Sequence, residues 1–356
     1  MYLSVRQYVI DAYGVYYHTL SVLFRELFIV TLLNSRKFMK LGILMDPISR
    51  INIKKDSSFA MLLAAQKRGW DLVYMEMQDI YTNNDIPMAN VQNLSVVENP
   101  ENWFTLSDKR TEELADLDII LMRKDPPFDL EYIYSTYILE HAERLGTLVV
   151  NSPASLRNAN EKFFITHFSN CIAPTQVSRS METLFEFIKK HKDTIIKPLD
   201  GMAGQSIYRV SESDHNCKVI LESMTKEGSA YVMAQKFVPE ISAGDKRILL
   251  IDGEPIPYAL ARIPADGEVR GNLARGGSGQ GIELSDRDRW ICQQVGPRLR
   301  EMGLIFVGID VIGDYLTEIN VTSPTCIREL DSLYNIDIAG QLMDALEKRK
   351  QIGKQN

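Results

Sequence analysis

In the first half of the chain, two kinds of hydrophobic pattern alternate. Short, nearly unbroken apolar runs are typical of buried strands, and they occur at residues 40–45, 71–77, 117–122 and 147–150. Residues 57–68 and 130–145 instead mix apolar and polar positions over helical lengths, and a glycine follows each. Asp56 or Ser57 supplies a cap for the first of these helices. Because strands and helices alternate, the pattern predicts an α/β domain with an open, mostly parallel sheet.

The pattern changes further along the chain. Residues 82–112 are polar and poorly periodic, which predicts a long excursion. Beyond about residue 160, short apolar runs, tight turns and few helices predict an α+β body made of two lobes. We therefore expect an N-terminal domain at 39–160 and a body at 161–350, with lobes of about 161–240 and 241–350.

The first 38 residues do not continue this pattern. Residues 20–33 are apolar, but they are too short to span a membrane and are interrupted by Arg25 and Glu26. A basic start and a clear small-residue cleavage site are both missing, so we do not expect a signal peptide. Met39 directly precedes a clean strand. We expect translation to start there, residues 1–38 being an upstream misannotation; an amphipathic peripheral helix is the alternative.

Composition narrows the function classes. The chain has 356 residues with 45% hydrophobic and 24% charged residues, as in ordinary soluble globular proteins. A net charge of −7 argues against a general nucleic-acid surface, so an anionic ligand needs local clusters of arginine and lysine. The four cysteines lack zinc or CxxC spacing and fit the reduced thiols of a cytoplasmic protein. We expect neither a nucleic-acid nor a membrane partner.

A polar hairpin near the C-terminus carries the clearest candidate chemistry. The sequence GIDVIGDYLTEIN places Asp310 after an apolar strand at 304–309, and Glu318 and Asn320 on a second strand at 315–321. A spacing of two puts Glu318 and Asn320 on one face, and the Gly-Asp turn lets Asp310 return to that face. Three oxygen donors without histidine or cysteine suit Mg²⁺. The alternative is an ordinary hairpin whose polar residues face water.

Four earlier elements suit a nucleotide. Lys162 lies in a helical stretch at 161–168. Lys197 lies near the end of a strand at 194–198, directly before Pro198. The small-residue loop that follows lets backbone N–H groups approach phosphates; its candidates are Gly201, Gly204, Gln205 and Ser206. A strand at 231–238 offers an edge for adenine; its candidates are Gln235, Lys236, Phe237 and Val238. Each element alone has an ordinary explanation, such as a turn or a solvated charge.

The order of these elements resembles the ATP-grasp superfamily, and a Walker A motif is not present. Longer strings resemble one family within it, bacterial glutathione synthetase, from Met39 to about residue 348. Among these strings are GILMDPISRINIKKDSSFAMLLAAQKRG, DIILMRKDPPFD, IIKPLDGMAGQSI, GDKRILLIDGEPIPYALARIP, RGNLARGG and LTEINVTSPTCIRE. The resemblance implies a two-lobed ATP-grasp body that joins γ-glutamylcysteine to glycine and cleaves ATP to ADP and phosphate through an acyl phosphate.

The resemblance also implies roles for particular residues. It implies that Lys162 and Lys197 offset phosphate charge, that Asp245 belongs to the nucleotide site, and that the hairpin holds Mg²⁺ or Mn²⁺. Two ions are expected, bridged by Glu318. The expected substrate-binding residues are Arg123, Arg247, Arg262, Arg270 and Ser323. Arg270 lies in a glycine-rich segment at 263–278 that we expect to close as a lid. A homotetramer is expected on the same ground.

Two other interpretations remain open. Another ATP-grasp ligase, joining D-alanine to D-alanine or adding glutamate, shares the same nucleotide chemistry. The N-terminal string MRKDPPFD argues against it, because that domain helps to form the acceptor site. The second alternative, a non-catalytic nucleotide-binding regulator, is disfavoured by the intact lysine, carboxylate and amide positions.

Overall fold

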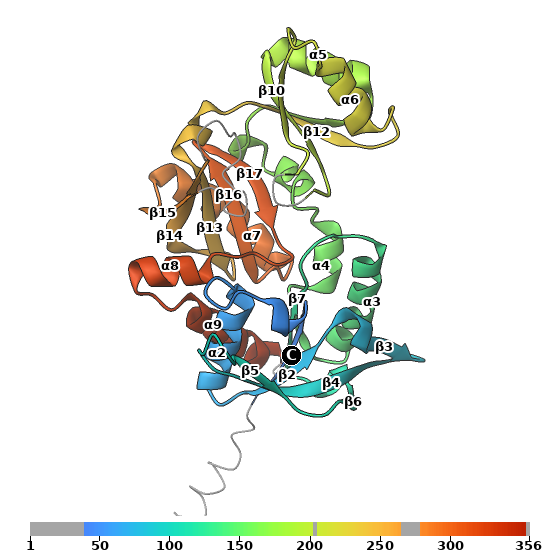
Figure 1. Cartoon of the computed structure of the whole chain (residues 1–356), viewed down its shortest axis with the longest axis vertical. Coiled ribbons are helices and arrows are strands. Elements are labelled where there is room, and N and C mark those ends of the chain that lie inside the picture. Colours follow the sequence, from blue (N-terminus) through green and yellow to red (C-terminus); the bar gives the residue numbers. More distant parts are fainter. Residues whose placement is uncertain (1–38, 202–204, 265–277, 354–356) are drawn as a thin grey trace, which may run out of the picture. The chain divides into compact units, whose positions relative to one another are not determined.

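The structure is a computed structural model that describes residues 39–201, 205–264 and 278–353 (Figure 1). The described residues from Lys40 onward belong to one compact unit. The expectations for residues 1–38 lie outside the described residues. Within the described stretches, we find no helix that is both long and apolar enough to cross a membrane.

The N-terminal sheet has a parallel part with the strand order β2-β1-β7-β8. Its strands are β1 (Lys40–Met45), β2 (Asp71–Met75), β7 (Ile119–Arg123) and β8 (Leu148–Val150). The first predicted helix is α2 (Ser57–Lys67), and the Asp56 carboxylate caps it by accepting a hydrogen bond from the Phe59 amide. The second is α3 (Leu130–Arg144), followed by α4 (Pro153–Asn158). The predicted α/β pattern of this region is confirmed.

The prediction of a long excursion at 82–112 is wrong, because these residues form strands that join the sheet. The region forms antiparallel strands, namely β3 (Ile80–Asn83), β4 (Ile86–Val96), β5 (Phe104–Leu106) and β6 (Arg110–Glu113). The sheet is therefore mixed, with β4 pairing antiparallel to β2. Buried positions in β4 alternate up to Val91 and resume at Leu94, so the break between them hides the period of two.

A small antiparallel sheet follows, with the order β11-β10-β12-β9. Its strands are β9 (Thr175–Ser178), β10 (Asp193–Pro198), β11 (Tyr208–Ser211) and β12 (Val232–Lys236). The helices α5 (Met181–His191) and α6 (Cys217–Thr225) lie together against it and share its core (Figure 1). The helical stretch expected at 161–168 is only the short 3-10 turn η4 (Phe163–His167).

The third sheet is antiparallel, in the order β15-β14-β13-β16-β17. Its strands are β13 (Asp245–Ile251), β14 (Glu254–Ile263), β15 (Ser278–Glu283), β16 (Phe306–Ile312) and β17 (Tyr315–Asn320). The C-terminal half also contains α7 (Asp286–Glu301), α8 (Ile327–Tyr334) and α9 (Ile338–Gly353). Asp310 lies inside β16 and not at its end, a correction to the predicted strand boundary.

Candidate active site

A cleft of about 320 Å³ gathers residues from the small sheet and from the third sheet. Strands β10 and β12 line it together with β13, β14, β16 and β17, and the segment before η4 adds further contacts. Most of the residues singled out from the sequence line this cleft: Lys162, Lys197, Gly201, Gln205, Gln235, Lys236, Phe237, Val238, Asp245, Arg247, Arg262, Asp310, Glu318, Asn320 and Ser323. The listed residues lie up to 161 positions apart in sequence, from Lys162 to Ser323, and surround one space.

The polar hairpin brings its three oxygen-bearing side chains together. Asp310 in β16 is the register partner of Glu318 in β17, and Asn320 lies opposite Gly308. The Asn320 amide donates to Asp310 Oδ2 over 3.2 Å and to the Gly308 carbonyl over 3.1 Å. Two carboxylates and an amide on one face form a hard-oxygen set that fits a divalent cation such as Mg²⁺.

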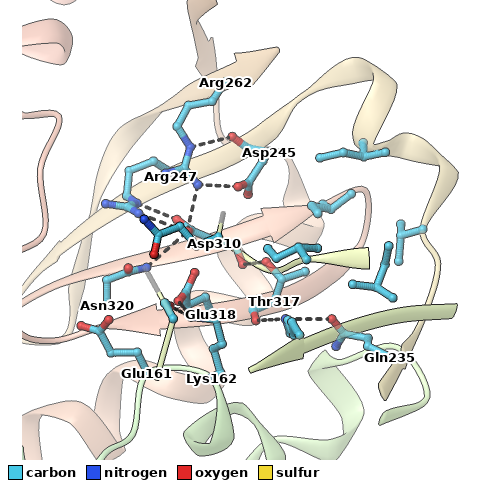
Figure 2. A pocket seen from close by; sticks show the side chains of 18 of the residues that line it. Glu161, Lys162, Gln235, Asp245, Arg247, Arg262, Asp310, Thr317, Glu318 and Asn320 are labelled. Carbon is cyan, nitrogen blue, oxygen red and sulfur yellow. Dashed lines mark hydrogen bonds and ion pairs between the residues drawn. The ribbon is translucent and has the colours of Figure 1, made fainter. Parts of the chain in front are cut away.

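Asp310 is the most heavily paired carboxylate in the cleft (Figure 2). Arg247 binds both of its oxygens, with Nε–Oδ1 at 2.6 Å and Nη2–Oδ2 at 3.1 Å. Arg262 Nη2 lies 2.9 Å from Oδ2 and also binds Asp245 at 2.5 Å. Burial alone would raise the pKa of Asp310, but the two guanidinium groups hold it well below the usual range. Burial raises the pKa of Asp245 to about 6, against the opposing effect of Arg262.

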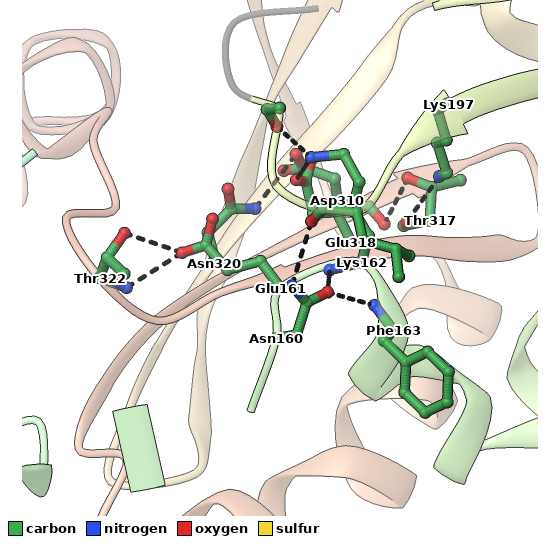
Figure 3. Close-up of polar contacts among 12 residues, drawn as sticks. Asn160, Glu161, Lys162, Phe163, Lys197, Asp310, Thr317, Glu318, Asn320 and Thr322 are labelled. Carbon is green, nitrogen blue, oxygen red and sulfur yellow. Dashed lines mark hydrogen bonds and ion pairs between the residues drawn. The ribbon is translucent and has the colours of Figure 1, made fainter. Parts of the chain in front are cut away.

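The two lysines approach the same hairpin (Figure 3). Lys162 Nζ lies 2.9 Å from Glu318 Oε1 and also donates to the Gly201 carbonyl. Lys197 Nζ donates to the Thr317 carbonyl over 3.1 Å and to Gln235 over 3.3 Å. Burial lowers the pKa of Lys197 to about 8. Burial opposes the charge of Lys162 as well, but Glu318 raises its pKa. The cleft therefore concentrates cationic groups beside the oxygen atoms of the hairpin.

A more apolar edge lies along β12. Gln235 is buried, and its Nε2 donates to Thr175 Oγ1 over 2.9 Å. Phe237 follows the end of β12 and is half-buried. Ile195, the register partner of Gln235, and Ile312 also line the cleft. Polar groups beside apolar side chains are what a planar heterocyclic base requires.

Four of the predicted residues are placed differently or are not described. Arg123 and Ser206 are described but do not line the cleft. Arg123 is buried, and donates to Ser58 Oγ and to the Pro324 carbonyl, each over 2.9 Å. Gly204 and Arg270, with most of the predicted lid, lie outside the described residues.

Other lining residues were not singled out from the sequence. Glu161 accepts hydrogen bonds from the amide and hydroxyl of Thr322 at 3.0 and 2.9 Å (Figure 3). It also accepts one from the Val321 amide over 2.9 Å. Burial, and secondarily Glu318, raise the pKa of Glu161. Asp125 and Pro126 also line the cleft, and they belong to the string MRKDPPFD, of which only the arginine was chosen. Both residues follow the carboxyl end of strand β7, where open α/β sheets bind ligands, and this position could have identified them from the sequence.

Two family models match the chain. The model described as prokaryotic glutathione synthetase, N-terminal domain, matches residues 39–157, and the model described as prokaryotic glutathione synthetase, ATP-grasp domain, matches residues 161–335. The chain belongs to the prokaryotic glutathione synthetase family. Glutathione synthetase of Pseudomonas aeruginosa is 61% identical over 86% of this chain and 97% of that protein. Glutathione synthetase of Shigella flexneri is 58% identical over 88% of this chain and 99% of that protein.

Two solved structures with the same fold are more distant in sequence. A D-cycloserine synthetase has a TM-score of 0.62 at 14% identity, covering 87% of this chain and 99% of that one. An ATP-grasp protein with a RimK domain from Sphaerobacter thermophilus has a TM-score of 0.57 at 15% identity, covering 86% and 98%. At such identities the likeness concerns the fold alone, and it is that of the two-lobed ATP-grasp body.

Membership in the glutathione synthetase family sets the coarse chemistry of the cleft. The protein is an ATP-dependent, ADP-forming ligase that acts on small molecules and uses a divalent metal. No cluster of three or more His, Cys, Asp or Glu side chains suited to a metal occurs in the described parts of the chain. The hairpin set is of a different kind, because its third member is the Asn320 amide.

Proposed function

We propose that this protein joins γ-glutamylcysteine to glycine to form glutathione, with ATP cleaved to ADP and phosphate. The observation that carries the proposal is a single cleft in which two buried lysines face the Asp310–Glu318 pair, in a chain of this family. The other ATP-grasp ligases share this nucleotide chemistry, but the match of residues 39–157 to the family's N-terminal domain does not favour them.

The reaction explains the need for so many cations. The γ-glutamylcysteine carboxylate attacks the γ-phosphorus of ATP, forming an O–P bond while the bond to ADP breaks. The glycine amine then attacks the carbonyl carbon, a C–N bond forms, and phosphate leaves as the amine loses its proton. Both steps develop or move anionic charge, so a site that positions reactants and offsets charge supplies most of the catalysis.

Each wall of the cleft has a part in this proposal. Lys162 and Lys197 would offset the phosphate charge, and Gly201 and Gln205, which line the cleft, would offer backbone N–H groups to the phosphates. The base lies along the edge formed by Gln235, Lys236, Phe237 and Val238, with Asp245 also contributing to the nucleotide site. Ser206, Gly204 and Arg270 keep their sequence-based roles as hypotheses.

Arginines serve the acid groups of the substrates. Arg247 and Arg262 are buried in the cleft wall, where a guanidinium can bind a carboxylate or phosphate in two-pronged fashion. Ser323 lines the same cleft and can donate its hydroxyl to a substrate carboxylate. Arg123 is not among the lining residues and donates to the carbonyl of Pro324, the residue after Ser323, so we assign it an indirect part in shaping that segment.

Asp310, Glu318 and Asn320 would hold the metal. We propose Mg²⁺, replaceable by Mn²⁺, and two ions that Glu318 would help to hold. Bound there, the metal would supply charge neutralisation and polarise the γ-phosphoryl group. We also propose the two-domain division near residue 160, a homotetramer, and a cytoplasmic location; four buried free thiols support the last.

The test is coupled ADP release from the full chain with Mg-ATP, γ-glutamylcysteine and glycine, omitting each component in turn. We expect release only with all three, and glutathione as the product by mass spectrometry. Replacing glycine with D-alanine should abolish product. ADP formation with D-alanine as the only amino acid would favour a D-alanine ligase. Nucleotide binding without any ADP formation would favour a regulator.

A further inference from the structure

Arg209 is a cation beside the cleft that the proposed chemistry does not use. It lies in β11, and its guanidinium carbon is 3.7 Å from the centroid of the Phe237 ring. Asp193 holds the guanidinium with two bonds, Nε–Oδ1 at 2.9 Å and Nη2–Oδ2 at 2.5 Å. The planar group is therefore fixed against an aromatic face, an arrangement that favours attraction between cation and ring.

The strand register places these residues on the face of the small sheet that lines the cleft. Ile195 in β10 pairs with Arg209 on one side and with Gln235 on the other. Asp193 precedes Ile195 by two residues and Phe237 follows Gln235 by two, so all five side chains share one face. Of these, Ile195, Gln235 and Phe237 line the cleft.

Asp193 also fixes the backbone beneath the ring. The Phe237 amide donates to the Asp193 carbonyl over 3.0 Å, one residue beyond the end of β12. Phe237 is thus held twice by the same residue, through its main chain directly and through its ring by way of Arg209. We call Asp193, Arg209 and Phe237 the Phe237 clamp.

We propose that Arg209, oriented by Asp193, is a positioning residue that holds the Phe237 ring where it covers the adenine base. The proposal rests on the nucleotide site of the proposed function. The Arg209 and Asp193 side chains are 46% and 41% exposed, so their ion pair by itself contributes little to stability. Its effect is instead to restrict the ring, which lowers the ordering cost of binding a base.

The experiment measures the Kd of ADP by titration calorimetry, without either peptide-forming substrate. In Arg209→Ala we expect the Kd of ADP to rise about three- to ten-fold, within the range of a partly exposed cation–aromatic contact. Arg209→Lys should give a smaller rise, since it keeps the cation but loses the two-pronged contact. The Kd of inorganic tripolyphosphate should stay the same, because it lacks a base.

Asp193→Asn separates positioning from simple charge. If Arg209 acted only as a general cation, removing the nearby anion would tighten ADP binding. If Asp193 orients Arg209, the same change weakens ADP binding. A matched control is Arg298→Ala, which removes an exposed ion pair with Glu301 on α7 and should leave both Kd values unchanged.

Three results would overturn the clamp: an unchanged ADP affinity in Arg209→Ala, an equal loss for ADP and tripolyphosphate, or tighter ADP binding by Asp193→Asn. Thermal unfolding of each variant checks that it is folded, and Arg209→Lys carries the test if Arg209→Ala is not. Because binding is measured without turnover, a wild-type protein that binds ADP but makes no glutathione would refute the proposed function and leave the clamp standing.

Discussion

The two walls of the cleft hold their side chains by different physics. On the hairpin wall, Asp310 is 3% exposed and has two guanidinium partners. On the wall made by the small sheet, Phe237 and the half-exposed Arg209–Asp193 pair depend on stacking and weak ion pairing. A buried charge without a partner is costly, so the charged side chains of the hairpin wall are held firmly in their ion pairs. The second wall can adjust to its ligand at little cost.

The largest expected effect tests the hairpin wall through Asp310→Asn. Two buried guanidinium groups would lose an anion, and we expect the free energy of unfolding to fall by about 3–5 kcal/mol. Turnover should be lost with it. Urea unfolding and ADP release measure the two effects. The control is Asp344→Asn, whose carboxylate is 68% exposed and pairs with Arg68; it should cost under about 1 kcal/mol. Equal losses would remove the contrast between buried and exposed pairs.

Glu318→Gln separates function from stability on the same wall. The Glu318 side chain is 24% exposed, and its partner Lys162 keeps the Gly201 carbonyl as an acceptor. We therefore expect a loss of stability of about 1–2 kcal/mol. Turnover should fall at least about 100-fold, as when one preorganised electrostatic group is removed. Normal ADP production by a folded variant would show that Glu318 does not hold the metal.

Lys197 joins the two walls, and its pH dependence has a definite sign. Its pKa in the folded protein is about 8, below the value near 10.4 of an unfolded chain. Between these values the unfolded state binds more protons, so the free energy of unfolding rises with pH. Relative to Lys197→Met, the wild type should gain up to about 3 kcal/mol between pH 8 and 10.5. The same dependence of the free energy of unfolding on pH in the wild type and in Lys197→Met would contradict this.

Local features of the hairpin wall were predictable from the sequence. The turn needs a positive φ, and Gly313 supplies it at 55°. Glu318 and Asn320 share a face because two residues separate them on one strand. These relations extend over about ten residues, and a strand period describes them fully.

Relations between distant segments could not be read in the same way. Arg123 was expected at the mouth of the sheet, but its direction depends on Ser58 and Pro324, which lie 65 and 201 residues away. Arg209 carried no signal either, since its partner Phe237 is brought near only by the pairing of β10 with both neighbouring strands. The pattern in β4 failed for a local reason, the break between Val91 and Leu94.

The smallest expected effect concerns the small-sheet wall, through Thr175→Val. The Thr175 hydroxyl accepts a hydrogen bond from Gln235 Nε2, and the buried Gln235 in turn accepts one from Lys197. The same hydroxyl donates to the Ala173 carbonyl over 2.7 Å, so losing these two neutral hydrogen bonds should lower the free energy of unfolding by about 1–2 kcal/mol. The Kd of ADP should rise by no more than a few-fold, because the Lys197 contact with the Thr317 carbonyl remains. Thr175→Ser keeps the hydroxyl and should behave as the wild type. A loss from Thr175→Val as large as that from Asp310→Asn would mean that both walls are equally rigid.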